Sequence, residues 1–252
     1  MAIFMLTRQI SSGNLPTGEK VLINLSRPRR FGKSVLVDTL EAYFMGKKEL
    51  FEGLKIMQME TEWVKRPVIR LDMSRAGAEP ETLRSYLNNI FRQYEKEYSL
   101  VPDPADSLAD RFNAIIVGAY EQTGQQVAIL IDEYDSPLQH SWKTPEHDAC
   151  TAIYKSVFAV LKKEDEHERF VFITGITKFS QLSIFSELNN LDNISLFDQY
   201  SAICGISKTE LTTQMKPDIE AMGEALNMTY EECLKELTQF YDGYHFSHEN
   251  IG

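Results

Sequence analysis

The segment VLINLSRPRRFGKS, residues 21–34, constrains the fold of this chain more than any other part of the sequence. Its first five residues form a mostly apolar run of strand length, and a basic loop follows after Ser26. Gly32, Lys33 and Ser34 then begin a stretch in which apolar residues recur with the period of a helix. A buried strand that leads through a short loop into a helix is typical of layered α/β proteins.

The loop has the chemistry of a phosphate-binding site. We expect its backbone N–H groups, and those of the first helical turn, to face an anion that the helix dipole also favours. Lys33 supplies a flexible cation for phosphate oxygens, and the Ser34 hydroxyl is a hard oxygen ligand for Mg²⁺. We therefore predict a nucleoside triphosphate as the ligand, Mg²⁺ as cofactor, and these nucleotide-binding residues: Arg29, Arg30, Phe31, Gly32, Lys33, Ser34 and Val35.

One position departs from the GxxxxGK[ST] pattern, because Arg27 stands where the first glycine belongs. With Pro28 beside it, we expect the start of the loop to be stiff and to carry extra positive charge. The tripeptide Gly-Lys-Ser also occurs by chance. A basic surface turn is therefore the alternative interpretation of this segment taken alone.

A second apolar run, residues 127–131, ends in Asp132 and Glu133. A carboxylate pair at a strand end is costly unless it faces a ligand, a metal or solvent. We predict that Asp132 joins Ser34 as a metal ligand and that Glu133 is the catalytic base that deprotonates water. Capping of the next helix is the alternative interpretation of this acidic pair.

A further apolar run ends in Thr174. We predict that Thr174 senses the γ-phosphate as a catalytic residue beside Glu133 and Lys33.

The distribution of apolar residues predicts a three-layer α/β fold with a mainly parallel sheet. Helix-period patterns separate the expected strands, as in right-handed βαβ units. The expected strands are residues 21–25, 68–71, 127–131, 170–173 and, from a weaker pattern, 200–206. From residue 208 three short amphipathic helices are expected, so we predict an α/β core over residues 1–207 and a small helical lid over residues 208–252.

Composition narrows the class of protein. The formal net charge is −11, from 26 Lys and Arg against 37 Asp and Glu, which argues against a protein that coats nucleic acid through bulk charge. Residues 1–36 are nevertheless basic, which leaves a local nucleic-acid contact open. The three cysteines form no CxxC pair, and the sequence shows neither a signal peptide nor an apolar run of about 20 residues. We predict a cytoplasmic protein without membrane contacts.

Four segments, in chain order, resemble the AAA-ATPase-like family: SRPRRFGKS, LIDEYDSPL, FITGITKFSQLSIFSELNNL and FYDGYHF. This bacterial family, common in gut anaerobes, usually joins a P-loop NTPase region to a C-terminal domain of the PD-(D/E)xK nuclease superfamily. The resemblance implies an additional-strand P-loop NTPase fold in which Lys33 and Ser34 serve phosphate and Mg²⁺. It also implies that Asp132 and Glu133 are the acidic pair and that Arg27 is a family trait. No carboxylate-rich nuclease core is evident, so we expect that domain to be absent from this chain.

The leading hypothesis is a Mg²⁺-dependent ATPase that couples hydrolysis of the β–γ phosphoanhydride bond to conformational change. One alternative is a nucleotide-binding switch with little turnover that regulates a partner or a nuclease domain. Another is a nucleic-acid-binding module that uses the basic N-terminal segment. No residue can be assigned as an arginine finger, so we expect hydrolysis to need a homo-oligomer or a nuclease-like partner.

Overall fold

The computed structural model describes residues 20–162, 166–176, 191–241, 244 and 246. The chain forms two compact units, Met1–Ser195 and Leu196–Gly252. The boundary between these units precedes position 207/208, where the sequence suggested a division, although the three helices of the second unit do begin at Lys208. The division into domains at 207/208 stays a prediction.

The first unit is built on a five-stranded sheet in the order β2-β3-β4-β1-β5, and its strand pairs are parallel. The strands are β1 (Val21–Ser26), β2 (Val68–Asp72), β3 (Val127–Asp132), β4 (Glu168–Gly175) and β5 (Asp192–Asn193). Every residue of β1 and β3 is buried, as expected of mostly apolar strands in the middle of a parallel sheet. β4 lies between the strand that precedes the basic loop and the strand that ends in the acidic pair. This is the predicted additional-strand α/β arrangement.

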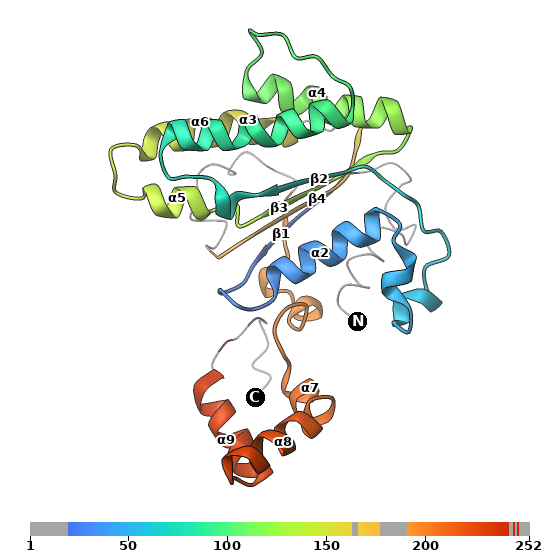
Figure 1. The fold of residues 1–252 in the computed structure, drawn as a ribbon, viewed down its shortest axis with the longest axis vertical. Helices are drawn as coiled ribbons and strands as arrows, with labels where there is room; N and C mark the ends of the chain where they lie inside the picture. The colour runs from blue at the N-terminus through green and yellow to red at the C-terminus, as the bar shows by residue number, and fades with distance from the viewer. Residues whose placement is uncertain (1–19, 163–165, 177–190, 242–243, 245, 247–252) are drawn as a thin grey trace. The chain divides into compact units, whose positions relative to one another are not determined.

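Helices cover both faces of the sheet (Figure 1). α2 (Lys33–Phe44) lies on one face, and α3 (Pro80–Glu97), α4 (Leu108–Thr123) and α6 (His147–Phe158) lie on the other. Phe91 of α3 stacks on Phe112 of α4 at a centroid distance of 5.4 Å, and both rings are fully buried. A capping box between Ser107 and Asp110 fixes the start of α4. The three predicted layers are confirmed.

Short helical elements connect these layers. α5 (Ser136–Ser141) follows β3 directly. The 3₁₀ turns are η1 (Lys48–Phe51), η2 (Lys55–Gln58), η3 (Met73–Arg75), η4 (Ala159–Lys162), η6 (Ile194–Leu196) and η7 (Asp198–Tyr200). Most of the family segment that follows β4 lies at residues 177–190, outside the described residues.

The prediction of a strand at residues 200–206 is wrong. Tyr200 ends η7 and residues 201–205 form turns, in which Gly205 has a φ of 86°, a left-handed conformation that interrupts an extended chain. The fifth strand is instead β5, which pairs with β1 through Asp192 and Asn193. Two polar residues leave no apolar run of strand length, so the sequence pattern does not show this strand.

The second unit contains three helices, α7 (Lys208–Thr213), α8 (Lys216–Leu226) and α9 (Tyr230–Tyr241), as predicted. Asn227 caps the C-terminus of α8, and its φ of 54° turns the chain back toward α9. A Cβ atom on Gly223 would lie 2.7 Å from the Met228 carbonyl oxygen, so this glycine permits the close turn. Across the residues that the structure describes, each helix is too short or too polar to cross a lipid bilayer.

Candidate functional site

The loop between β1 and α2, residues 27–32, lies at the edge of the sheet where the strands end. The amide of Arg27 donates to the carbonyl oxygen of Gly175 at 3.1 Å, which ties the loop to the end of β4. Arg30 and Gly32 adopt left-handed conformations, with φ of 67° and 81°. Backbone turns of this kind are components of anion-binding nests.

The N-terminus of α2 is open to a ligand. Its N-cap residue is Gly32, no side chain caps the first turn, and the first turn contains no acidic residue. The first N–H groups of an α-helix have no partner within the helix, and the helix dipole makes this end positive. The loop and α2 therefore provide backbone donors where the sequence predicts the phosphates.

Lys33 is buried beneath this loop. Its Nζ donates to the carbonyl oxygens of Arg27 at 3.0 Å and Pro28 at 2.9 Å. Arg29, Arg30, Ser34 and Val35 are exposed, whereas Phe31 is half-buried. The predicted nucleotide-binding residues thus lie together on one loop and the first turn of one helix.

The acidic end of β3 meets this helix turn. The hydroxyl of Ser34 donates to the carboxylate of Asp132, which also accepts the amide of Glu133 at 2.9 Å. Burial raises the pKa of Asp132, whose side chain is 3% exposed, and these two hydrogen bonds oppose the shift. The two residues predicted as metal ligands therefore lie in contact, and their oxygen atoms are donors that suit Mg²⁺.

Asp72 is a neighbour of this pair that the sequence analysis did not single out. It ends β2 and lies opposite Asp132 in the parallel register. Its charge further raises the pKa of Asp132, whereas Arg70 lowers it. A signal was available, because the strands VIRLD and VAILID both end in Asp and parallel strands end at the same edge of a sheet.

Glu133 has a strained backbone, with a φ of 48°. The conformation is held from both sides: the amide of Tyr134 donates to the Thr174 carbonyl at 3.1 Å, and the amide of Ser136 donates to the Glu133 carbonyl at 2.9 Å. Non-glycine residues in such conformations cost about 1–3 kcal/mol and cluster at functional sites. The side chain is half-buried at the same edge as Asp132.

Asp135 is a second residue that the sequence analysis did not assign. Its carboxylate is 1% exposed and accepts the Ile176 amide at 3.0 Å and the Gln139 side chain at 2.5 Å. A Cβ atom on Gly175 would lie 2.5 Å from Asp135 Oδ1. The carboxylate therefore fixes the chain as it leaves β4. Its position three residues after Asp132, within LIDEYDSPL, was the available signal.

Two expected features lie elsewhere. The hydroxyl of Thr174 donates to the Leu25 carbonyl at 2.9 Å and is fully buried between strands, so the structure does not bring it to the loop. The Arg27 side chain is 1% exposed and donates to the carbonyl oxygens of Ser26 and Ser195. The extra charge expected at the start of the loop is therefore directed into the protein and away from the loop surface.

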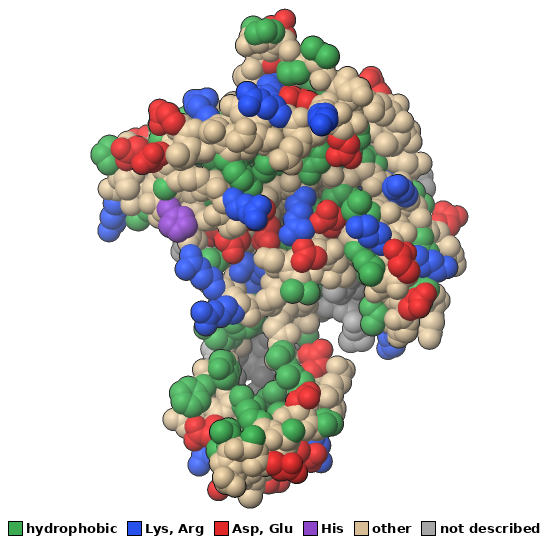
Figure 2. Space-filling model, viewed as in Figure 1, with side chains coloured by type: hydrophobic (Ala, Val, Ile, Leu, Met, Phe, Trp, Pro, Cys, Tyr) green, Lys and Arg blue, Asp and Glu red, His purple; other side chains and the backbone are tan. Residues whose placement is uncertain are grey.

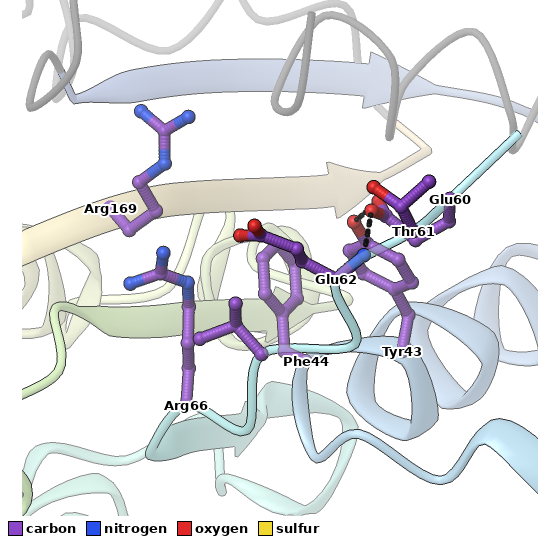
Figure 3. A pocket seen from close by; sticks show the side chains of 8 residues that line it. Tyr43, Phe44, Glu60, Thr61, Glu62, Arg66 and Arg169 are labelled. Atoms are coloured by element: carbon purple, nitrogen blue, oxygen red, sulfur yellow. Dashed lines mark hydrogen bonds between the residues drawn. The ribbon is translucent and has the colours of Figure 1, made fainter.

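A separate hollow of about 270 Å³ lies at the other end of α2 (Figure 3). Tyr43 donates to Glu60 at 2.6 Å there, and desolvation raises the pKa of the tyrosine. Arg66 and Arg169 also line the hollow. Burial lowers the pKa of Arg66, and the positive charge of Arg169 lowers it further. These residues precede or begin strands, so the hollow lies at the edge opposite the loop.

Neither a metal cluster in the described part of the chain nor a broad basic surface on the face in Figure 2 stands out. No group of three or more His, Cys, Asp or Glu side chains that could hold a metal ion occurs among the described residues. On the face that Figure 2 shows, Lys and Arg side chains are interspersed with Asp and Glu over the first unit.

This chain is similar in sequence to a curated protein. A curated relative, an uncharacterized protein in the vnfD 5' region of Azotobacter chroococcum mcd 1, is 32% identical over 231 residues. The match covers 90% of this chain and 42% of that protein, so the chain spans less than half of the relative's length.

Solved structures similar to this chain include two archaeal proteins from Aeropyrum pernix. The ORC1 protein in complex with DNA has a TM-score of 0.42 at 10% identity, with 97% of this chain and 60% of that chain covered. The ORC2 protein in its ADP form has a TM-score of 0.41 at 14% identity, with 94% and 67% covered. The family model described as predicted AAA-ATPase matches residues 14–185, and the chain therefore belongs to the AAA-ATPase-like family.

Proposed function

We propose that this chain is a Mg²⁺-dependent nucleoside triphosphatase that hydrolyses ATP. The observation that carries the proposal is the hydrogen bond between Ser34 and Asp132, because it joins the phosphate loop to the acidic strand end. Two segments almost a hundred residues apart in the sequence then form one site. Membership of a family described as predicted AAA-ATPase supports the same conclusion.

The residues divide the chemistry between them. Backbone amides of residues 29–35 bind the phosphates, and Lys33 leaves the carbonyl oxygens of Arg27 and Pro28 to pair with the β and γ oxygens. Ser34 and Asp132 would hold Mg²⁺, which would neutralise charge on the phosphate oxygens. Binding of the cation favours ionised Asp132 and offsets the burial that raises its pKa.

Glu133 is the general base of this proposal. It takes a proton from water, whose oxygen forms a bond to the γ-phosphorus in line with the departing ADP oxygen. The β–γ bridging bond breaks, and ADP and inorganic phosphate are released. Thr174 has no direct part, because its hydroxyl proton is donated to Leu25 within the sheet. A homo-oligomer or a nuclease-like partner that completes the site stays a prediction.

Phosphate release from ATP and Mg²⁺ tests the proposal directly. We expect turnover in the native chain, loss of binding and turnover in Lys33→Ala, and binding without turnover in Glu133→Gln. Turnover that persists in both variants would show that the activity does not come from this site. Binding in the native chain without turnover would favour the nucleotide-binding switch instead.

A further inference from the structure

A buried polar network connects the phosphate loop to the residue at which the first unit ends. Arg27 Nη1 donates to the Ser195 carbonyl oxygen at 2.7 Å and to the Ser26 carbonyl oxygen at 3.0 Å. The amide of Ser26 donates to Ser195 Oγ at 2.8 Å. Ser195 Oγ in turn donates to Asn193 Oδ1 at 2.6 Å. We call these four residues the Arg27–Ser195 brace.

The brace also contacts Lys33. The backbone oxygen of Arg27 accepts from Lys33 Nζ at 3.0 Å, while its backbone nitrogen donates to Gly175 at 3.1 Å. One residue therefore contacts the nucleotide-binding lysine, the end of β4 and Ser195. A guanidinium is costly to bury unless carbonyl or carboxylate oxygens accept its N–H groups, so these contacts also hold the Arg27 side chain in place.

Ser195 occupies the junction between the two units. Asn193 belongs to β5, which pairs with β1, and Ser195 is the last residue of the first unit. The next residue, Leu196, begins the unit that carries α7, α8 and α9. Arg27 therefore contacts the residue that directly precedes the helical unit in the chain.

We propose that Arg27 is a positioning residue that couples nucleotide binding in the loop to the chain at residues 193–196. The inference rests on the proposed function. When phosphate draws Lys33 away, the carbonyl oxygen of Arg27 loses this partner, the start of the loop moves, and the side chain carries Ser195 with it. A glycine at position 27, as in the usual motif, has no side chain that reaches Ser195.

Hydrogen exchange of backbone amides tests this coupling, with a fluorescent ATP analogue to measure binding to the same samples. In the native chain, saturating ATP and Mg²⁺ should change exchange at residues 192–200 by at least about threefold, a free-energy difference of roughly 0.7 kcal/mol. Arg27→Gly restores the common glycine and should bind nucleotide within about threefold of the native affinity, yet lose this change. Arg27→Lys retains a hydrogen-bond donor at this position and should show part of the nucleotide-induced change in exchange.

The matched control is Arg111→Gln. Arg111 is a half-buried arginine whose Nε lies 2.6 Å from the Glu95 carboxylate between α3 and α4, so its loss lowers stability without touching the brace. The control should retain the nucleotide-induced change. The coupling would be overturned if Arg27→Gly kept the full nucleotide-induced change in hydrogen exchange at residues 192–200. It would also be overturned if the native chain bound nucleotide without any such change. Native affinity equal to that of Lys33→Ala would instead overturn the proposed function.

Discussion

The backbone of Glu133 adopts a conformation that glycine would adopt at lower cost. Its φ of 48° is left-handed, which costs an L-residue about 1–2 kcal/mol, whereas glycine adds about 0.5–1 kcal/mol of chain entropy to the unfolded state. Glu133→Gly should therefore raise the free energy of unfolding by up to about 1 kcal/mol while turnover is lost. Urea unfolding and phosphate release measure the two effects.

The control for this substitution is Glu133→Gln, which removes the carboxylate but retains the Cβ atom. It should lose turnover without a gain in stability. A less stable Glu133→Gly variant would show that the carboxylate stabilises the fold and that the strained backbone does not serve the reaction.

The burial of Asp132 predicts a pH dependence of stability in the absence of Mg²⁺. Because its pKa is raised above the ordinary 3.8, the folded state binds the proton more tightly than the unfolded state. The contribution of this carboxyl group to stability is thus greatest at acid pH and declines as pH rises through the interval between 3.8 and the raised value. Asp132→Asn does not titrate. Its unfolding free energy relative to the native chain should increase over this interval.

Urea midpoints at a series of pH values, with and without Mg²⁺, measure this difference. Mg²⁺ should recover stability at neutral pH in the native chain more than in Asp132→Asn, because the cation favours the ionised carboxylate. A pH-independent difference between the two proteins would contradict the assigned desolvation of Asp132.

Among the elements, the ends of β3 and β4 depend on the absence of a side chain at Gly175. An added Cβ atom would lie 2.5 Å from Asp135 Oδ1 and 2.6 Å from Tyr134 Cε1, both on buried side chains. Gly175→Ala should destabilise the protein by about 1–3 kcal/mol, as overpacking does in other cores. Denaturant unfolding measures the loss, and unchanged stability would show that the two strand ends separate readily.

The matched comparison is Gly124→Ala, at the C-terminus of α4. No atom lies within 4 Å of its added Cβ, but its φ is 64°, so the expected cost of about 1 kcal/mol comes from the backbone alone. In addition, Gly175→Ala should weaken nucleotide binding, since the Gly175 carbonyl accepts the Arg27 amide, whereas Gly124→Ala should not.

The elements also show what local sequence patterns can predict. Buried parallel strands leave continuous apolar runs, and parallel strands end at one edge, so the meeting of Ser34 with Asp132 followed from the order of the motifs. The two-residue β5 leaves no such run. Nor does a local pattern reveal the contact of Arg27 with Ser195, which are 168 residues apart. The sequence pattern places the arginine in a basic loop, and only the fold provides the carbonyl oxygens that accept its N–H groups.

For the whole molecule, a ligand that binds only the folded state raises stability by mass action. At a free concentration one hundred times the dissociation constant, this amounts to about 2.7 kcal/mol, or an increase of about 5–10 °C in Tm for a chain of this size. ATP with Mg²⁺ should produce such a shift in calorimetry. Because the chain forms two compact units, the shift should appear in the transition of the unit that contains Lys33.

Chelation of Mg²⁺ should reduce this shift, and Lys33→Ala should abolish it. A shift that persisted in Lys33→Ala would place the nucleotide elsewhere. The hollow lined by Arg66 and Arg169 is the alternative anion site to test, because its two guanidinium groups lie at the edge of the sheet opposite the loop. If Arg66→Ala left the shift intact and Lys33→Ala removed it, the stabilising anion would be bound at the loop, where the open N-terminus of α2 supplies backbone donors.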